Sequence, residues 1–414
     1  MQTPIHDFLR EYADADHERC HTPGHKGRAN PFDLTEVNAE AIDVITQSER
    51  NAARLFAAGR TFFSCSGATL GIFAMLAPFA GKRVAAFRDN HRSFIDAAIA
   101  LDVEVVWCYK LIQLKKAESA AVFVTNIDYY GNVADVSKIV QFVNCPVLVD
   151  NAHGAYLVFT QSPDPIHPMK LGAAMCTDSA HKTLPVLTGG AYVHIAADYM
   201  NDYGKTVADA MALFGTTSPS YLILESLDLC NVHIAQESEQ ARKTFPLITH
   251  LKERLRKRGY IVSYCEDILR VVVECTFYGY SGHDFAEELF KRGIVCEMQD
   301  AECVILMFST ITEQSAVERV YEAFCDIEPK EQFWVSELEL SKPRRVLSMR
   351  EAYFADKKTL PLSESAGEVC AGVHVTVPPC VPLIMPGEII ESDVMTALVR
   401  AGLREIDVVI PPCR

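Results

Sequence analysis

The chain has 414 residues, of which 49% are apolar and 22% charged, and its formal net charge is −15. This composition supplies enough apolar surface to offset the entropy cost of ordering a chain, so it excludes a disordered protein. The acidic balance argues against a nucleic-acid partner, which requires a basic face. Because domains usually have roughly 100–200 residues, the length predicts two or three of them.

The cysteines and the N-terminal sequence indicate the compartment. The 14 cysteines lie between Cys20 and Cys413 without a CxxC pair or a clustered Cys/His spacing, so we expect neither a disulfide scaffold nor a metal site. The start, MQTPIHDFLREYADADHERC, lacks the apolar core of a signal peptide. No run approaches the ~18 apolar residues of a membrane span. The sequence therefore predicts a cytoplasmic protein with reduced cysteines that contacts no membrane.

Short apolar runs alternate with amphipathic stretches over the first part of the chain. The runs are rich in β-branched and aromatic residues and predict buried strands at 83–87, 104–109, 120–126 and 145–150. Helical patterns lie between them, at 91–102 and 135–143. This alternation is typical of βαβ units, so the predicted fold class is α/β, with a large domain built on a mainly parallel sheet.

A charged amphipathic helix over 237–259, with Gly259 as its C-cap, leads into a second set of strands. These strands are predicted at 260–265, 268–276 and 303–309 and belong to a small α/β domain. From about residue 331 prolines become frequent, which suggests a C-terminal α+β domain. The predicted parts are an N-terminal arm over 1–30, a large domain over 31–235, a small domain over 236–330 and a C-terminal domain over 331–414.

The segment DSAHKTLPVLTGGAYVHI (178–195) contains the strongest candidate for chemistry. Most lysines are solvated, but Lys182 lies between apolar runs and should be partly desolvated. Desolvation lowers the pKa of an amine and makes it a nucleophile toward carbonyl groups. Lys182 is therefore a candidate Schiff-base lysine.

A second candidate lies in PVLVDNAHGAYLVF (146–159), where a predicted strand ends at Asp150 and His153 follows. Open α/β sheets bind ligands at the carboxyl ends of their strands. Asp150 either caps the following turn or keeps the ring nitrogen of a pyridine cofactor protonated.

Two weaker candidates precede these segments. In TFFSCSGATLGIFAML (61–76), small residues open an apolar helix whose N-terminal amides and hydroxyls suit a phosphate. His91 follows the strand at 83–87 and either caps a helix or stacks on a planar cofactor. A phosphate cradle, a histidine, an aspartate at a strand end and a later lysine together match a site for pyridoxal phosphate (PLP).

Several motifs resemble those of the ornithine/lysine/arginine decarboxylase family, which are bacterial fold-type I PLP enzymes. The match runs nearly end to end and rests on HTPGHKGR (21–28), NHRSF (90–94), DNAHGAY (150–156), SAHKTLPVLT (179–188), TTSPSYLILESLD (216–228), REAYF (350–354) and VPPCVPLIMPGE (377–388). The resemblance implies a decarboxylase that converts arginine, lysine or ornithine into CO2 and agmatine, cadaverine or putrescine, as in polyamine biosynthesis.

The resemblance also implies roles for individual residues. Lys182 would bind PLP as a Schiff base, and Asp150 would pair with the ring nitrogen of the cofactor. His91 would stack on the ring. His153 would lie beside the ring and, with Lys182, handle the proton of the reaction.

The same resemblance implies contacts to the phosphate, to a partner chain and to the substrate. The residues at or near the phosphate would be Ala68 (through its main chain), Thr69, Ser179 and His181. Ser218 and Ser220 would approach the site of a partner chain, which implies a homodimer. Glu388 is the candidate carboxylate for the substrate's distal cation, and Asp128 is a second candidate that the family match does not supply.

Three segments depart from the family pattern. VPPC (377–380) replaces a Tyr-Pro-Pro-Gly-like stretch, NIDYYG (126–131) stands where a Pro and a Thr commonly precede the tyrosines, and SCSGATLG (64–71) replaces an Asn- or Gly-rich loop. Cys65 and Cys380 lie in two of these segments. The resemblance also implies a compact form, which we expect to lack the extra N-terminal domain of larger members. These departures leave the PLP assignment in place and bear on the substrate.

Two alternatives stay open from the sequence. A PLP-dependent aminotransferase or lyase would clamp the substrate's α-carboxylate with an arginine of the small domain, and Arg270 lies in a predicted strand there. A weakly active PLP-binding regulatory homologue is the other, although it would not need both Lys182 and Asp150.

Overall fold

A computed structural model describes the chain except for residues 16, 35–38, 237, 337–339, 375–380 and 412–414. Contacts among the described residues divide the chain into two discontinuous units. The first unit comprises Met1–Pro78, Phe123–Val271 and Met307–Asp326, and the second comprises Phe79–Val122, Val272–Leu306 and Ile327–Arg414. The four-part division of the sequence stays a prediction. The VPPC segment, with Cys380, lies outside the described residues.

Seven strands form the main sheet, in the order β1-β7-β6-β5-β4-β2-β3. They are β1 (Arg60–Ser64), β2 (Arg83–Phe87), β3 (Glu104–Cys108), β4 (Ala121–Thr125), β5 (Val147–Asp150), β6 (Met175–Asp178) and β7 (Ala191–Ile195). Strand β5 pairs parallel with β6, and β2 pairs parallel with β3. Strand β7 is antiparallel to both of its neighbours, β1 and β6.

The α/β prediction with a mainly parallel sheet is confirmed. Strand β2 matches its predicted range, and β3, β4 and β5 lie within theirs. Every residue of β5 and β6 is buried, as expected for strands that are covered on both faces. Strands β1, β6 and β7 were not predicted, since their sequences lie in or beside the segments that were interpreted only as candidate sites.

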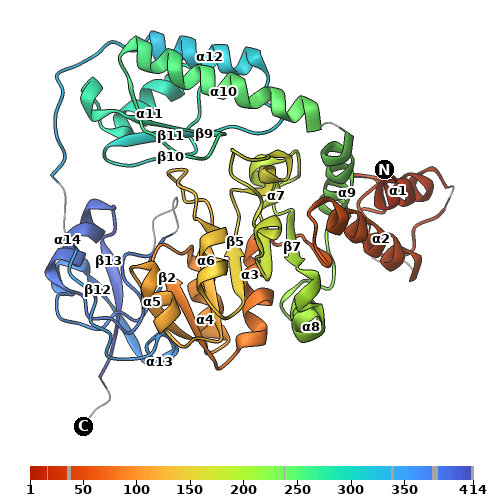
Figure 1. The fold of residues 1–414 in the computed structure, drawn as a ribbon, viewed down its shortest axis with the longest axis horizontal. Helices are drawn as coiled ribbons and strands as arrows, with labels where there is room; N and C mark the ends of the chain where they lie inside the picture. The colour runs from red at the N-terminus through yellow and green to blue at the C-terminus, as the bar shows by residue number, and fades with distance from the viewer. Residues whose placement is uncertain (16, 35–38, 237, 337–339, 375–380, 412–414) are drawn as a thin grey trace. The chain divides into compact units, whose positions relative to one another are not determined.

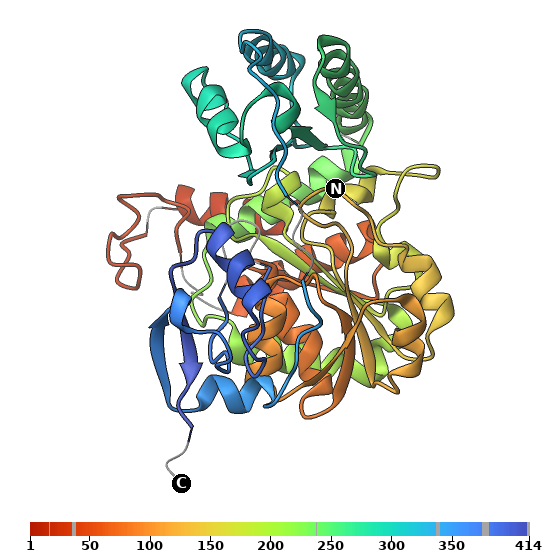
Figure 2. The same cartoon turned by 90° about the vertical axis from the view of Figure 1, so that its left-hand side faces the viewer.

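The helices of the first unit pack on its strands and on each other. They are α1 (Pro4–Asp14), α2 (Ala39–Leu55), α3 (Gly67–Leu76), α6 (Val136–Phe142), α7 (Ala180–Thr183), α8 (Met200–Phe214), α9 (Tyr221–Gln236), α10 (Ser238–Arg258) and α12 (Gln314–Cys325). Helices α10 and α12 lie side by side (Figures 1 and 2). The predicted C-cap of α10 is confirmed, since Gly259 follows the helix with a φ of +104°, a conformation that glycine adopts without strain.

The second unit contains helices α4 (Arg92–Ala100), α5 (Leu111–Lys116), α11 (Gly282–Lys291), α13 (Met349–Phe354) and α14 (Ser392–Arg400). An antiparallel pair, β12 (Lys357–Pro361) and β13 (Glu405–Val409), belongs to this unit as well. Its apolar core includes Leu362, Ile384, Val394 and Ile406, all of them buried.

A four-stranded sheet has the order β10-β11-β9-β8. Its strands are β8 (Ile261–Val262), β9 (Arg270–Glu274), β10 (Met298–Gln299) and β11 (Cys303–Met307). Strands β9 and β11 lie within their predicted ranges, whereas the strand predicted at 260–265 is only two residues long. The chain leaves the sheet after Val262, and the side chain of Tyr264 is 82% exposed.

Two sequence-based expectations concern the whole chain. Among the described residues, no helix combines the length and apolarity that a membrane crossing requires. None of the twelve cysteines that the structure describes is in a disulfide.

Candidate active site

Lys182 lies in helix α7, directly after strand β6. The strand ends at Asp178, and the backbone N–H of Lys182 donates to the carbonyl of Ser179 (3.0 Å). Lys182 is half-buried, and its Nζ lies 2.8 Å from Nε2 of His153. His153 is only 3% exposed. The structure thus brings an amine and an imidazole that were both predicted for catalysis into hydrogen-bond contact.

Asp150 is the last residue of β5 and is 4% exposed. One of its carboxylate oxygens, Oδ1, accepts a hydrogen bond from the backbone N–H of Ala152 (3.1 Å). The turn-capping interpretation of Asp150 is therefore confirmed. A carboxylate accepts several hydrogen bonds at once, so this contact is compatible with a second partner.

Tyr129 also belongs to this site, although the sequence gave it no role. Its ring meets the His153 ring edge-on, with centroids 4.6 Å apart and planes at 89°. The Lys182 Nζ lies 5.6 Å from the centroid of the same ring. The sequence contained a signal, because Tyr129 comes three residues after the end of the predicted strand at 120–126, just as His153 comes three residues after the end of the strand at 145–150.

A buried ion pair holds the backbone of Tyr129. Arg270 is fully buried, and its Nε and Nη2 donate to Oδ2 of Asp267 (3.3 and 3.2 Å) while Nη1 donates to the carbonyl of Tyr129 (3.1 Å). The Tyr156 hydroxyl donates to the other oxygen of Asp267 (2.8 Å), and burial, with this carboxylate, raises the Tyr156 pKa well above its usual value. The Arg270 guanidinium is thus bound to groups of the protein itself.

The predicted phosphate loop precedes helix α3. Ser64 Oγ donates to the carbonyl of Gly67 (2.9 Å) and accepts from the N–H of Ser66 (3.1 Å). Gly67, the first residue of α3, has a φ of +67°, a conformation that favours glycine, and nothing lies within 4 Å of where its Cβ would stand. No side chain at this position therefore covers the backbone of the first turn of α3. Of the two residues predicted here, Ala68 is buried and Thr69 exposed.

Cys65 connects this loop to the segment before α9. Its thiol faces the carbonyl of Ser220, with an Sγ–O distance of 3.6 Å. Burial raises the pKa of the Cys65 thiol to about 11, although the Ser220 contact lowers it. The thiol is therefore protonated at neutral pH, which argues against a nucleophile at this position.

The remaining predicted phosphate and partner residues of the first unit differ in exposure. Ser179 is buried, whereas Ser218 is exposed and Ser220 half-buried. The backbone carbonyl of Gly190 lies 3.0 Å from Nδ1 of His181, so this nitrogen is the donor. Burial lowers the pKa of His181, which favours the neutral imidazole.

His91 lies in the second unit, where it caps helix α4. Its Nδ1 accepts from the backbone N–H of Ser93 (3.2 Å). Of the two interpretations of His91, the capping one is thus confirmed. Stacking on a cofactor stays a prediction.

The two carboxylates predicted for substrate binding have partners within the chain. Glu388 is 2% exposed and forms a bidentate pair with Arg88, at 2.7 and 2.6 Å. Asp128 accepts from the backbone N–H of Asn132 (3.0 Å) and from its side-chain amide (2.7 Å). Each contact gives the carboxylate a local structural role, and the assignment of either residue to the substrate stays a prediction.

Comparison with known proteins shows which family the chain resembles. A family model described as Orn/Lys/Arg decarboxylase, major domain, matches residues 109–276, the range that includes Asp150, His153 and Lys182. The arginine decarboxylase of Bacillus subtilis (strain 168) is 26% identical over an alignment that covers 95% of this chain and 92% of that protein. These matches confirm the resemblance to the Orn/Lys/Arg decarboxylase family that the motifs indicated. They also confirm the expected class of enzyme, a decarboxylase.

Solved structures confirm the fold class. The E. coli constitutive lysine decarboxylase is similar with a TM-score of 0.78 and 16% identity, covering 99% of this chain and 82% of that chain. A structure of SPT with PLP is similar with a TM-score of 0.59 and 13% identity, covering 78% of this chain and 82% of that one. At these identities the likeness concerns the fold, which is the predicted fold-type I arrangement.

Proposed function

We propose that this protein is a PLP-dependent decarboxylase of a basic amino acid, acting on arginine, lysine or ornithine. The observation that carries the proposal is the 2.8 Å contact between Lys182 Nζ and His153 Nε2, at the carboxyl ends of β5 and β6. Open α/β sheets place their ligands at this edge. The family supports decarboxylation, and the relatives named arginine and lysine decarboxylase support a basic substrate.

The residues of the first unit fit the cofactor. Lys182 offers a primary amine for covalent attachment, and Asp150 offers a buried carboxylate for the ring nitrogen. The first turn of α3, opened by Gly67 without an obstructing side chain, offers backbone N–H groups for a phosphate. Thr69 in that turn, with Ser179 and His181 beside Lys182, would complete the phosphate contacts.

When bound, PLP supplies an electron sink for the charge that develops as the substrate's carboxylate leaves. The chain's own residues then have three tasks. Asp150 would present its buried carboxylate at the carboxyl end of β5, Tyr129 and His153 would shield and orient the Lys182 amine, and the Lys182–His153 hydrogen bond would carry the proton that is returned to the substrate. Burial of His153 excludes water from this proton.

A specific observation weakens the aminotransferase alternative. A carboxylate clamp needs an arginine whose guanidinium faces the substrate. Arg270, the candidate from the sequence, is fully buried and bound to Asp267 and to the carbonyl of Tyr129. The regulatory-homologue alternative is weakened by the intact Lys182–His153 contact, which a non-catalytic protein does not need.

Substrate choice, assembly and location complete the proposal. We infer a homodimer in which Ser218 and Ser220 approach the partner's site, since Ser218 is exposed on its own chain. The proposed location is the cytoplasm, and the amine product would enter polyamine metabolism. Glu388 is paired with Arg88. In the proposal, a cationic substrate would therefore meet the Glu388–Arg88 ion pair and not a lone carboxylate.

Two variants test the proposal. The protein is incubated with PLP, reduced with borohydride and digested, and the modified peptide is identified by mass spectrometry while CO2 release is measured. We expect the modification on Lys182, and loss of both modification and CO2 release in Lys182→Ala. The exposed Lys170 of the same unit provides the control, and Lys170→Ala should behave as the parent. CO2 release by Lys182→Ala at the parent rate, or amino-group transfer in place of CO2 release, would contradict the proposal.

A further inference from the structure

A row of buried polar side chains, linked by hydrogen bonds, crosses five neighbouring strands of the main sheet. Its members come from β1, β7, β6 and the residues that follow β5 and β4, which is the spatial order of these strands. We call it the polar belt, and it consists of Thr61, His194, Asp178, Asn151 and Asn126. No belt residue is more than 2% exposed. Sequence patterns had assigned no role to any of them.

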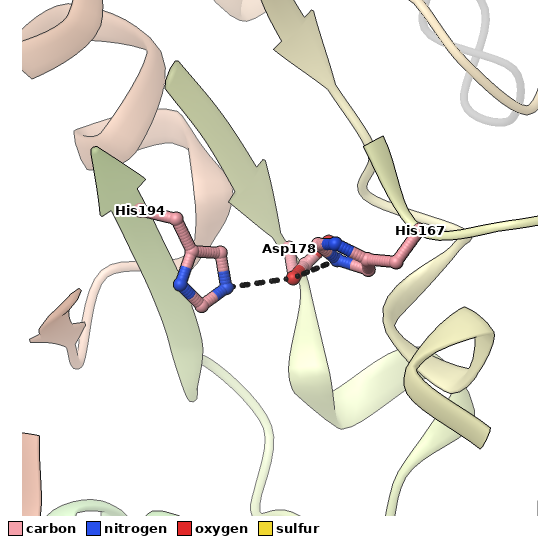
Figure 3. Close-up of side chains that lie close together, drawn as sticks. All are labelled: His167, Asp178 and His194. Atoms are coloured by element: carbon pink, nitrogen blue, oxygen red, sulfur yellow. Dashed lines mark hydrogen bonds and ion pairs between the residues drawn. The ribbon is translucent and has the colours of Figure 1, made fainter. Parts of the chain in front are cut away.

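The Asp178 carboxylate is the centre of the belt, and Figure 3 shows it between His194 and His167. Its Oδ2 accepts from Nε2 of His194 (2.9 Å) and from Nε2 of a further buried histidine, His167 (3.0 Å). Its Oδ1 accepts from Nδ2 of Asn151 (2.6 Å). The belt continues on one side from His194 Nδ1 to Thr61 Oγ1 (2.8 Å).

The arrangement is a hydrogen-bonded anion rather than a metal site. Ligand atoms of His167, Asp178 and His194 lie within 4.8 Å of one another, a spacing that a metal ion also requires. However, the backbone N–H of Met169 donates to Nδ1 of His167 (3.3 Å), so the ring proton of a neutral His167 is on Nε2. That nitrogen therefore donates to Asp178 and has no lone pair for a metal.

The electrostatics agree with this assignment. Burial alone would raise the pKa of the Asp178 carboxyl, but His167 and His194 outweigh it and hold the pKa below its usual range. Burial lowers the pKa of His194, although Asp178 opposes that shift. The buried Cys176 thiol, 4.0 Å from Asp178 Oδ1, has a pKa raised well above its usual value by burial and by this carboxylate. Asp178 is thus an anion surrounded by hydrogen-bond donors.

Asn151 joins the belt to the active site. It stands between Asp150 and His153 in the chain, and its carbonyl accepts from the N–H of Gly154 (2.7 Å). Its side-chain oxygen accepts from Nδ2 of Asn126 (2.7 Å). A Cβ on Gly154 would lie 2.0 Å from Asn151 Oδ1, so the segment 150–154 closes tightly around this side chain.

We propose that Asn151 is a positioning residue, through which Asp178 and Asn126 fix the segment that carries Asp150 and His153 relative to the Lys182 amine. The same carboxylate that orients Asn151 ends strand β6, four residues before Lys182. Asp178 therefore fixes the position of segment 150–154, which carries Asp150 and His153, relative to the segment that carries Lys182. This inference rests on the proposed function and extends it to residues that touch neither substrate nor cofactor.

Three variants test the inference, each measured for PLP affinity of the apoprotein and for the pH titration of the absorbance of bound PLP. Asn151→Ala removes both side-chain contacts. Asn126→Ala removes one of them and should act in the same direction with a smaller effect. Gly154→Ala keeps every hydrogen-bonding group, and its backbone φ of −106° suits alanine. The new Cβ would lie 2.0 Å from Asn151 Oδ1, so the variant displaces the Asn151 side chain. The exposed Asn144 of the same unit provides the control, Asn144→Ala.

We expect Asn151→Ala and Gly154→Ala to bind PLP about tenfold more weakly and to shift the absorbance midpoint by about half a pH unit or more, as displaced catalytic groups do. Asn144→Ala should coincide with the parent. A parent protein that fails to bind PLP would reject the proposed function. A parent that binds PLP while every folded variant matches it would overturn only the role of Asn151. If none of the three variants folds, the belt is a requirement of folding alone and the positioning role is likewise overturned.

Discussion

Replacement of Asp178 by asparagine tests whether a buried anion holds the polar belt together. All three close contacts of Asp178 come from donors: Nε2 of His167, Nε2 of His194 and Nδ2 of Asn151. Asparagine has nearly the same shape but offers one oxygen and one NH2 group. Since the NH2 group must replace one of the two oxygens, at least one buried donor faces another donor in the variant.

The expected cost follows from these contacts. An unsatisfied buried donor costs about 1–3 kcal/mol, and hydrogen bonds to a charged group lose part of their strength when the charge is removed. His194 can adapt by moving its proton to Nδ1 opposite Thr61, but His167 cannot, because the Met169 N–H already donates to its Nδ1. We therefore expect Asp178→Asn to lower the free energy of unfolding by about 3 kcal/mol.

Urea unfolding of the apoprotein at pH 7.5 and fixed protein concentration measures this change. Asp209→Asn is the matched control, since the Asp209 side chain is 64% exposed and pairs with Lys205 on the surface of α8. Loss of such a surface pair should cost less than about 1 kcal/mol. If Asp178→Asn were as stable as Asp209→Asn, the description of Asp178 as an ionised, triply bonded carboxylate would be refuted.

Three other outcomes follow from the structure. Burial raises the pKa of Glu49 from 4.5 to about 7. Between these two pH values the folded protein keeps a proton on Glu49 that the unfolded chain has released, so the free energy of unfolding falls as the pH rises from 4.5 to about 7. Glu49→Gln keeps an acceptor for the N–H of Phe63 and should raise the free energy of unfolding by about 1–3 kcal/mol at pH 8 but not at pH 4, as measured by urea titration at both pH values. Tyr129→Ala should lower kcat for CO2 release at least about tenfold, because it removes the ring beside Lys182, whereas Tyr129→Phe should stay near the parent; equal losses in both variants would assign the effect to the hydroxyl instead. Cys65, with a pKa of about 11, should react with iodoacetamide at pH 8 about a hundredfold more slowly than an ordinary thiol, as followed by peptide mass spectrometry, and rapid labelling of the native protein would show that its burial is wrong.

The sequence predicts the features that depend on neighbours in the chain. Strand β2 and helix α10 were foreseen because their apolar spacing and end signals are local. The same holds for Lys182, Asp150 and His153, which lie in motifs at strand ends. Their contact was only implied, because His153 and Lys182 are 29 positions apart in the chain.

Long-range pairing explains what the sequence did not predict. The polar belt joins residues such as Thr61 and His194, which are 133 positions apart. Glu388 was interpreted as a substrate carboxylate from the family resemblance, and its partner Arg88, 300 positions away, could not be foreseen. Arg270 was considered as a clamp because it lies in a predicted strand of the small domain, and only the fold brings it to Asp267 and the carbonyl of Tyr129. A charged residue in a predicted strand shows its role only when its partner is known.

The most direct test of the central claim is the product balance from carboxyl-labelled arginine, lysine and ornithine, incubated separately with the purified protein and PLP. We expect one of the three to yield labelled CO2 and its amine in equal amounts, with no release by Lys182→Ala. Formation of a keto acid in place of CO2, or no reaction with any of the three, would contradict a decarboxylase of basic amino acids.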